Sequence, residues 1–426
     1  MSSSGCSDSF GRRSLNVNPE PTSDPRRLGI YVDVRFYEIE TRGGRSGLAV
    51  NRAAPLFACE VGRHFGRTIF FGRKSRTPIK GGLGQGEVEL PHDVELIVLP
   101  DYSSLRNVLQ VGRATLGTVG EMWRGLSHVD IVWAWGPHPF SILLVTFAAI
   151  RRKRVALCVR EDTVEYHRQR LPNRRWLPIL GLVWGTEAVY RVFARFFPTT
   201  AVGARVTQRY ARGRSAVLPI AISLVRAEQV VPFPPNKDWT AEISLLTVGR
   251  LEPEKNPLLL IEALQRLDAE FPGLFKLVWL GRGRLEEDVI RRAKELEIEN
   301  RLELQGYVPY GPELLAFYHR AHAFVHVSLT EGLPQVLIEA AAAGLPIVAT
   351  DVGGVAAALN GGLAGVLVPP ADVDALVGAI RRVYEDEALR QAIVTEGLRI
   401  AKQSTVEGVA AQVAPFIAGG STKTSA

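Results

Sequence analysis

Residues 323–351 read AFVHVSLTEGLPQVLIEAAAAGLPIVATD and set the fold class of this chain. An apolar run at 323–328 is followed by an Ala-rich segment of helix length at 334–343 and by a second apolar run at 345–351. This alternation predicts two parallel strands joined by a helix, with the strands buried on both faces. Pro334 suits the first position of that helix, where a missing N–H costs nothing, and Gly332 allows a sharp turn before it.

The same alternation continues in both directions along the chain. Further strands are predicted at 28–34, 67–72, 94–100, 130–135, 154–160, 244–250, 276–283, 301–308 and 364–370. A segment rich in proline and polar residues, 226–241, is the predicted linker. The sequence therefore predicts an α/β protein with two Rossmann-like, doubly wound parallel-sheet domains that face each other across a cleft. The predicted segments are a disordered tail (1–27), an N-terminal domain (28–225), a C-terminal domain (242–402), a terminal helix that packs back toward the N-terminal domain (403–418) and a disordered tail (419–426).

Composition narrows the class of protein. The chain has 426 residues, of which 46% are hydrophobic, so it is too apolar to be disordered and long enough for two domains. Its net charge of +7 fits an anionic substrate, an anionic membrane surface or a nucleic acid, but no nucleic-acid recognition module is found. Cys6, Cys59 and Cys158 are scattered, and the N-terminus has no apolar signal core, so we expect a cytoplasmic protein.

Charged residues and glycines follow the predicted strands of the C-terminal half. Arg250 ends the first strand and Lys255 follows five residues later, where a guanidinium and an ammonium suit a diphosphate. A surface pair flanking a turn is the equal alternative. Gly281 and Gly283 lie at the end of the second strand, and such a pair alone is more often only a tight turn.

The helix at 334–343 begins with a second candidate site. The N–H groups of Leu333, Gln335 and Val336 lack helical partners, which makes an anion site. Glu331 alone is readily explained as an acid near a helix start, whereas Glu339 lies on an apolar helix, where a carboxylate needs partners such as ribose hydroxyls.

Together these motifs resemble a known family. VGRLEPEKNPLLLIEAL, LGRGRLEEDV, LQGYVP, SLTEGLPQVLIEAAAAGLPIVATDVGG and GVLVPPAD follow one another within residues 243–400. This region is similar to the donor domain of GT-B glycosyltransferases, in particular the retaining family four (glycosyl transferases group 1). Asn256 stands where that family often has glycine.

The resemblance implies a site and a reaction. Arg250 and Lys255 should clamp the donor diphosphate, Glu339 should hold the ribose hydroxyls, and Glu331 should contact the transferred sugar. The backbone of Gly332, Leu333 and Pro334, with Gly281 and Gly283, should complete donor binding. The implied enzyme is a retaining hexosyltransferase (EC 2.4) of polysaccharide, glycolipid or other glycoconjugate biosynthesis. It should use a UDP-, GDP- or ADP-sugar, with no cofactor and no metal.

The N-terminal half resembles the family less and is expected to bind the acceptor. Its glycine-rich segment includes Gly43 and Gly44. Trp133 and Trp135 occupy the positions of the family's His-x-His, so His138 is the substitute candidate for the catalytic histidine, although a lone histidine in a Pro-rich turn is more often structural. Arg160, where the family commonly has histidine, and the following Glu161 are candidates for the acceptor side.

Three other interpretations of the function, and one possible partner, are compatible with the sequence. The rivals are a sugar-phosphate-using GT-B enzyme, a degenerate non-catalytic sugar-nucleotide-binding protein and a basic nucleic-acid binder. Residues 168–197 combine aromatic and basic side chains, which fits peripheral contact with the inner face of a membrane and a lipid-linked acceptor, but equally a core helix.

Overall fold

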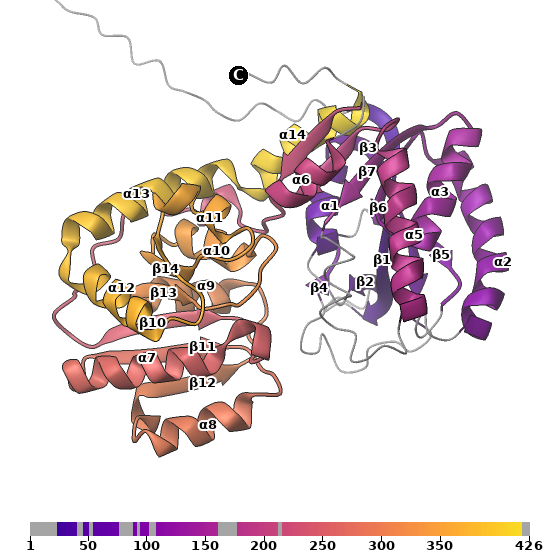
Figure 1. Cartoon of the computed structure of the whole chain (residues 1–426). Helices are drawn as coiled ribbons and strands as arrows, with labels where there is room; N and C mark the ends of the chain where they lie inside the picture. Colours follow the sequence, from indigo (N-terminus) through magenta and orange to yellow (C-terminus); the bar gives the residue numbers. More distant parts are fainter. Residues whose placement is uncertain are drawn as a thin grey trace, which may run out of the picture.

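A computed structural model gives the fold and describes residues 24–40, 46–50, 54–75, 88–91, 94–101, 108–160, 177–211 and 215–419. Two sheets, each covered by helices, form two domains that lie side by side (Figure 1). The predicted fold class, two doubly wound parallel-sheet domains, is confirmed.

The N-terminal sheet is parallel except for a short hairpin. Its parallel strands follow the spatial order β5 (Val94–Leu99), β3 (Phe65–Lys74), β1 (Asp24–Glu40), β6 (Ile131–Gly136), β7 (Arg154–Val159), β8 (Thr199–Val202), β9 (Val217–Ile220). The chain reverses its direction of travel across the sheet between β1 and β6, which are neighbours. β2 (Ser46–Val50) and β4 (Val88–Glu89) extend the sheet with antiparallel pairing next to the far end of β1.

Helices cover both faces of this sheet. One face packs against α1 (Ala54–Gly62) and, from the other end of the chain, α14 (Val406–Ala418). The opposite face packs against α2 (Val108–Gly125), α3 (Pro139–Ile150) and α5 (Leu177–Phe193), with α6 (Ala204–Tyr210) after β8. The consecutive residues Ile30 and Tyr31 of β1 point to opposite faces of the sheet and therefore lie in different cores.

The C-terminal sheet has six parallel strands. Their order is β12 (Leu302–Gly306), β11 (Phe275–Leu280), β10 (Ile243–Val248), β13 (Ala323–His326), β14 (Ile347–Thr350), β15 (Val366–Val368). Numbered within the domain, this is 3-2-1-4-5-6, the Rossmann order, which reverses between β10 and β13.

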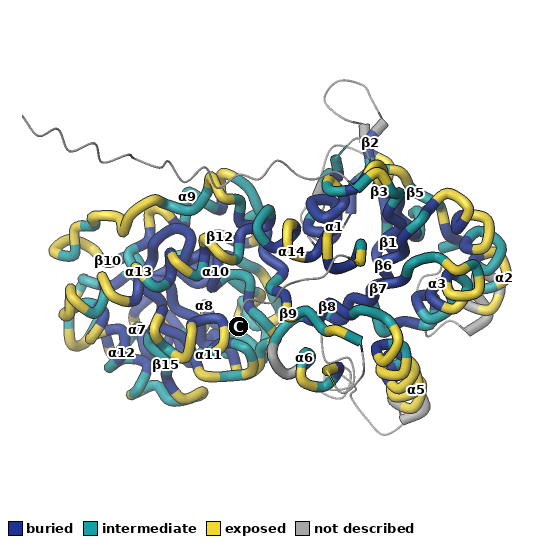
Figure 2. Tube along the Cα trace, turned by 90° about the horizontal axis from the view of Figure 1, so that it is seen from above, coloured by how far each residue is buried: buried dark blue, intermediate teal, exposed yellow. Residues whose placement is uncertain are grey.

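The helices of this domain also form two layers. One face carries α7 (Pro257–Glu270), α8 (Glu286–Glu295) and α12 (Val373–Glu385); the other carries α9 (Pro312–Arg320), α10 (Gln335–Ala342), α11 (Val355–Ala358) and α13 (Glu387–Gln403). The buried strands lie between these layers (Figure 2). Asp372 caps α12 by accepting a hydrogen bond from the N–H of Ala375 at 2.9 Å.

The two domains meet where the chain crosses between them. Val406 N donates to the carbonyl of Val225 at 2.8 Å, and Arg226 pairs with Glu407 of α14 at 3.1 Å. From the C-terminal domain, Tyr310 Oη donates to the carbonyl of Leu224 at 2.7 Å. The helix α14 thus belongs to the core of the N-terminal domain.

The structure departs from the sequence predictions at three places. β1 begins at Asp24, inside the predicted tail, because Asp24 pairs with Arg26 and its strand adds to β3. β1 also runs on to Glu40, beyond the predicted end at residue 34, and pairs there with β2 in antiparallel fashion. α10 begins at Gln335, one residue later than predicted, and Pro334 is its N-cap.

Candidate functional site

The reversal point of the C-terminal sheet brings two loops together. Ligands of open parallel sheets bind beyond the carboxyl ends of the strands where the strand order reverses. Here these ends are Gly249 after β10 and Val327 after β13. The loop after β10 forms a short 3-10 helix, η4 (Pro253–Lys255), and Leu329 N from the other loop donates to the carbonyl of Glu254 at 2.8 Å. The two loops therefore hold each other in place.

Lys255 and Glu331 join these two loops by a direct ion pair. Lys255 Nζ contacts Glu331 Oε1, Ser328 Oγ donates to the same oxygen at 2.7 Å, and His326 Nε2 lies 3.1 Å from it. The side chains are shielded from water, being 21% exposed for Lys255, 11% for Glu331 and 4% for His326. An ammonium, a carboxylate and an imidazole thus converge at the reversal point.

The electrostatics of Glu331 follow from these neighbours. Burial alone raises the pKa of its carboxyl group, because a desolvated charge is costly. The bonds and charges supplied by His326 and Lys255 outweigh burial and lower the pKa to about 2. Glu331 is therefore a carboxylate at every physiological pH and keeps Lys255 in position.

Arg250 lies on the same loop as Lys255, but its side chain is more exposed to solvent. Its Nη2 atom is 2.8 Å from Glu254 Oε1, and its side chain is 56% exposed. Since Glu254 also accepts the hydrogen bond from Leu329, the guanidinium is held beside the η4 turn and remains open to solvent. An exposed guanidinium next to a half-buried ammonium is an arrangement that can meet a diphosphate.

Asn256 ends the η4 turn in the left-handed region, with φ 49° and ψ 50°. Glycine adopts this conformation most readily, and asparagine is among the few other residues that tolerate it. Asn256 therefore adopts a turn conformation in which glycine is also readily accommodated.

The glycines predicted near the site allow the backbone of a neighbouring segment to approach closely. A Cβ on Gly281 would lie 2.0 Å from the carbonyl oxygen of Gly249, and a Cβ on Gly283 would lie 2.2 Å from that of Leu251. Likewise, a Cβ on Gly353 would lie 1.9 Å from the carbonyl oxygen of Glu331, whose loop is thus packed onto the turn after β14. Gly332 lies at the exposed bend of that loop, and Leu333 is half-buried.

Glu339 lies apart from this cluster, within the apolar layer. It is 6% exposed, and its Oε2 atom accepts a hydrogen bond from Tyr318 of α9 at 2.7 Å. Burial raises the pKa of its carboxyl group, although the bond from Tyr318 counteracts part of this effect. Among the described residues, no hydrogen bond or ion pair joins Glu339 to Arg250 or to Lys255.

His138 lies at the reversal point of the other sheet, between β1 and β6. It is the N-cap of α3, and its Nδ1 atom accepts a hydrogen bond from the N–H of Phe140 at 3.2 Å and lies 2.8 Å from Tyr31 Oη. Burial lowers the pKa of the imidazole, so the ring is held neutral. His138 thus caps α3 and also lies beyond the carboxyl end of β6, where the strand order of this sheet reverses.

The structure describes only some of the other residues singled out in the N-terminal half. Trp133 and Trp135 are buried in the sheet, 5.1 Å apart between ring centroids, so they are core residues. The guanidinium of Arg160, after β7, lies 5.5 Å from the centroid of the Trp135 ring. Gly43, Gly44 and Glu161 lie outside the described residues.

Sequence reasoning missed His326, Ser328 and Tyr318. His326 is the last residue of β13, and Ser328 follows it two positions later with the buried Val327 between them. This alternation was an available signal for two side chains pointing the same way. Tyr318 lies on a different helix from Glu339, and only the tertiary fold reveals their contact.

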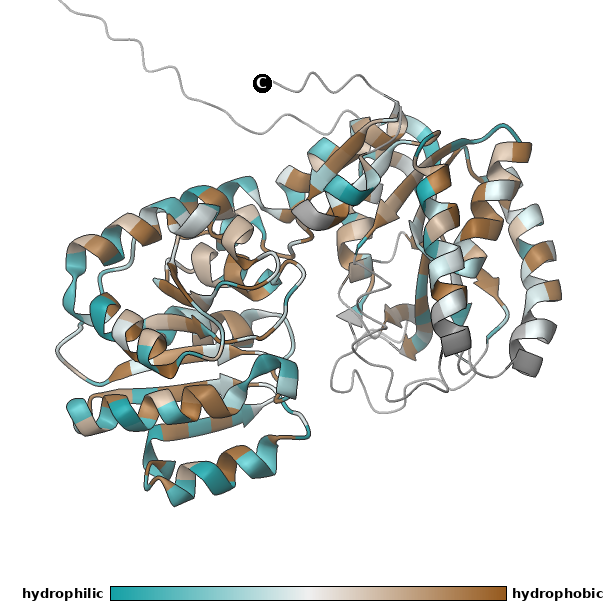
Figure 3. Cartoon of the chain, viewed as in Figure 1, coloured by the Kyte–Doolittle hydropathy of each residue, from teal (hydrophilic) through white to brown (hydrophobic). Residues whose placement is uncertain are grey.

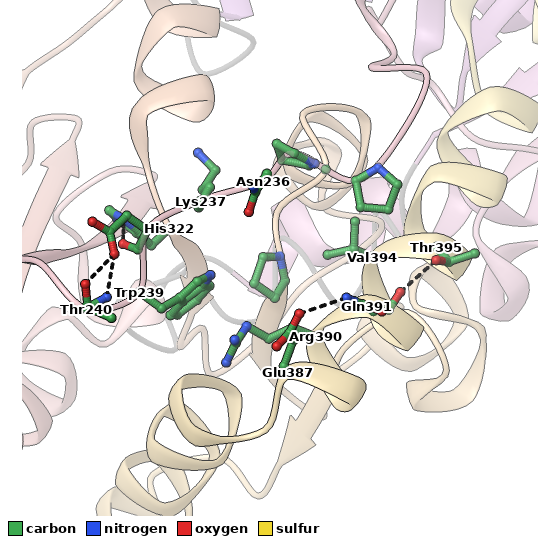
Figure 4. A pocket seen from close by; sticks show the side chains of 15 residues that line it. Asn236, Lys237, Trp239, Thr240, His322, Glu387, Arg390, Gln391, Val394 and Thr395 are labelled. Atoms are coloured by element: carbon green, nitrogen blue, oxygen red, sulfur yellow. Dashed lines mark hydrogen bonds between the residues drawn. The ribbon is translucent and has the colours of Figure 1, made fainter.

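A cavity of about 630 Å³ lies elsewhere in the C-terminal domain (Figure 4). Its walls come from the linker around Trp239, from the residues that precede β13 and β14, and from the first turns of α13. Arg390 stacks on Trp239 at 4.3 Å from the ring centroid. This cavity is at the amino ends of the strands, away from Lys255 and Glu331. Among the described residues, no three His, Cys, Asp or Glu side chains group as metal ligands.

Comparisons with known proteins agree with the geometry. Residues 234–399 match the family model described as "Glycosyl transferases group 1", and they contain Arg250, Lys255, Glu331 and Glu339. Residues 234–399 are therefore similar to the glycosyl transferases group 1. Over 160 residues, the chain is 38% identical to a glycogen synthase of Mycobacterium tuberculosis, a match that covers 38% of each chain. It is 32% identical over 168 residues to the O-antigen chain mannosyltransferase B of Escherichia coli, covering 39% of this chain and 43% of the relative.

The likeness in structure extends beyond the group 1 domain. The crystal structure of Anabaena Alr3699/HepE in complex with UDP aligns with 92% of this chain and 100% of its own, with a TM-score of 0.64 at 16% identity. The overall fold is therefore GT-B. In sequence, the match spans less than half the length of the curated relatives named above, and only the group 1 domain is shared at that level.

Proposed function

We propose that this protein is a glycosyltransferase that moves a sugar from a nucleotide-diphosphate sugar to a hydroxyl acceptor, in polysaccharide, glycolipid or other glycoconjugate biosynthesis. The observation that carries the proposal is the ion pair of Lys255 and Glu331 at the reversal point of a Rossmann-ordered sheet, with Arg250 beside it. The arrangement falls within the group 1 match, and the names of the matched relatives include a glycogen synthase and a mannosyltransferase.

The donor diphosphate would lie at the η4 turn. Cations are most useful there because negative charge builds up on the leaving nucleotide as the sugar departs. Lys255 and Arg250 would supply that charge without a metal ion, which is why we propose a metal-independent reaction. The structural neighbour crystallised with UDP supports a uridine nucleotide as the first to test; GDP and ADP sugars are the alternatives.

Glu331 would have two tasks in this reaction. In the unliganded site it holds Lys255, and with donor bound its carboxylate would contact the sugar while the ammonium turns to the phosphate. The acceptor hydroxyl would attack the face that the diphosphate leaves and pass its proton to the departing phosphate, so the anomeric configuration is retained. Glu339, the buried acid with one bond from Tyr318, would accept bonds from the ribose hydroxyls once they displace part of its apolar surroundings.

Three measurements test this function. A thermal-shift panel of UDP-, GDP- and ADP-sugars should raise the melting temperature with one nucleotide, because a ligand that binds only the folded state stabilises it. Release of that nucleotide should be insensitive to EDTA, and NMR of the product should show the donor's anomeric configuration. An absence of stabilisation by all three nucleotides would refute the function; nucleotide binding without turnover would identify the degenerate alternative.

We also propose peripheral contact with an anionic membrane through the outer face of α5. The described part of the predicted segment begins at residue 177; residues 168–176 lie outside it. Leu182, Trp184, Val192 and Phe196 are 55%, 64%, 47% and 73% exposed. This outward, exposed face of α5 is visible in Figure 2, and its apolar bands in Figure 3. Arg191 of α5 and Arg195, two residues after its end, are exposed as well.

An apolar outer face with arginines and aromatic residues is typical of a helix that lies in a lipid interface. No helix in the described part of the chain combines the length and apolarity needed to cross a bilayer. Flotation with vesicles containing anionic lipid should recover the wild type at low salt and lose the double variant Trp184→Ser, Phe196→Ser. Phe233→Ser is the matched control, since Phe233 is 77% exposed but lies on the linker. Equal flotation of both variants would refute the contact.

A further inference from the structure

The carboxylate of Glu331 is held through one of its two oxygens. Lys255 Nζ contacts Oε1, Ser328 Oγ donates to Oε1 at 2.7 Å, and His326 Nε2 lies 3.1 Å from the same atom. Among the described residues, no hydrogen bond goes to Oε2, and Oε2 is not one of the buried polar atoms without a partner. Three donors therefore share Oε1, while Oε2 stays open to solvent.

His326 presents a buried nitrogen to this oxygen. Its side chain is only 4% exposed, and within the described part of the chain Nε2 has no partner besides Glu331. A buried polar nitrogen without a hydrogen bond is costly. Because a carboxylate only accepts hydrogen bonds, the imidazole must carry a proton on Nε2 to interact with it favourably. The imidazole N–H is thus available to Glu331 alone.

The end of β13 fixes both His326 and Ser328 on one side of the chain. The two residues are two positions apart and point the same way, whereas Val327 between them packs into the core on the opposite side. The carbonyl of Ser328 accepts a hydrogen bond at 2.6 Å from Thr350 Oγ1, at the end of the neighbouring strand β14. Two of the three donors therefore come from the sheet, and only Lys255 comes from the separate η4 turn.

Donor binding changes what this oxygen needs. In the proposed function the Lys255 ammonium turns to the diphosphate, so Oε1 loses one of its three donors. A buried carboxylate remains a stable anion only while hydrogen-bond donors compensate for its desolvation. We propose that His326 and Ser328 are positioning residues that hold Glu331 through Oε1 in the donor complex, where His326 takes the place of Lys255 and Oε2 meets the transferred sugar. This inference rests on the proposed function, in which Glu331 contacts that sugar.

The test separates the two parts of the donor by isothermal titration calorimetry. Each protein is titrated with the nucleoside diphosphate (UDP, GDP or ADP) that the wild type binds best, and with the corresponding nucleotide-sugar. Ser328→Ala removes one hydroxyl, and His326→Leu removes the imidazole. His326→Gln is the conservative variant, because an amide N–H can replace the imidazole N–H.

Thr247→Val is the matched control for the loss of a buried hydroxyl. Thr247 is 4% exposed and lies on β10, which pairs with β13. Its Oγ1 atom donates to the carbonyl of Val325 at 2.7 Å and not to Glu331. This variant should therefore melt at a lower temperature and still bind both ligands as the wild type does. It shows what a purely structural loss next to β13 looks like.

In Ser328→Ala and His326→Leu the Kd for the nucleotide-sugar should rise about tenfold or more, as for loss of a hydrogen bond to a charged group. The Kd for the nucleoside diphosphate should stay close to the wild-type value, because Lys255 and the η4 turn are intact. His326→Gln should bind the nucleotide-sugar nearly as tightly as the wild type. Thermal melting checks that each variant folds, and Ser328→Ala with His326→Gln carries the test if His326→Leu does not.

Four results would overturn the inference. They are wild-type binding of the nucleotide-sugar by Ser328→Ala, equal losses for the two ligands in the removal variants, the same losses in Thr247→Val, and weak binding of the nucleotide-sugar by His326→Gln. A wild type that binds no nucleoside diphosphate, or no nucleotide-sugar, refutes the proposed function instead.

Discussion

Replacement of Glu331 by glutamine should lower the stability of the C-terminal domain at neutral pH. The ordinary pKa of this carboxyl group is 4.5, and its contacts lower it to about 2 in the folded protein. Because a displacement of one pKa unit is worth about 1.4 kcal/mol, the charged form contributes roughly 3 kcal/mol to folding. The side chain is only 11% exposed, so screening by solvent removes little of this contribution.

The pH dependence has a definite sign. A carboxyl group whose pKa is lowered by folding stabilises the protein above its unfolded pKa, and this contribution disappears as the pH falls through the folded pKa. The wild type should therefore lose stability between pH 4.5 and about 2, and the Glu331→Gln protein should lose less over the same interval.

Urea denaturation at pH 7 and pH 3.5, followed by circular dichroism and tryptophan fluorescence, measures both effects. Glu303→Gln is the control, because Glu303 also pairs with a lysine of the same sheet, Lys276, but the two side chains are about a third exposed. A smaller loss is expected there, since exposed ion pairs contribute little. If Glu331→Gln unfolds at the same urea concentration as the wild type at pH 7, the inferred electrostatics of the site are wrong.

Two further changes test the surroundings of the site. Glu339→Gln should leave the protein as stable as the wild type, or more stable, at neutral pH. Burial raises the pKa of Glu339, so its charged form opposes folding above the unfolded pKa. Thermal melting at pH 7 and pH 4 measures this effect, and a large loss of stability at pH 7 would contradict it. Gly353→Ala should destabilise the domain by more than about 1 kcal/mol and weaken nucleotide binding, because φ is +56° and a Cβ would meet the carbonyl of Glu331. Gly378→Ala, on α12 with open space around it, should be neutral or stabilising, and equal melting of the two alanine variants would count against the account.

The strands and helices of the C-terminal domain were predictable because periodic apolar runs alternate with turn residues. The run at 323–328 and the helix at 334–343 correspond to β13 and α10 with small shifts of their ends. Parallel strands also place their carboxyl ends at one edge, so the neighbourhood of Arg250, Lys255 and Glu331 could be anticipated.

Contacts between distant elements were not predictable. The sequence predicts that the terminal helix packs back toward the N-terminal domain, where α14 lies, but not which of its residues enter that core. No local pattern signals that β2 pairs with the extended end of β1. The register shift between Tyr31 and Arg35 depends on the pairing of β1 with β3, and the sequence around it reads as an ordinary buried strand. The tryptophans at 133 and 135 could have been ligand-binding residues by position, but the sheet buries both.

The most direct test of the account is nucleotide binding by Lys255→Ala, measured by isothermal titration calorimetry with UDP, GDP and ADP. Lys276→Ala is the matched control, because Lys276 also pairs with a glutamate, Glu303, but stands at the amino end of β11 in the same sheet. The wild type should bind one of the three nucleotides, Lys255→Ala should bind it about tenfold to a hundredfold more weakly, and Lys276→Ala should bind it normally. Full affinity in Lys255→Ala, or an equal loss in Lys276→Ala, would contradict the claim that the η4 turn binds the donor diphosphate.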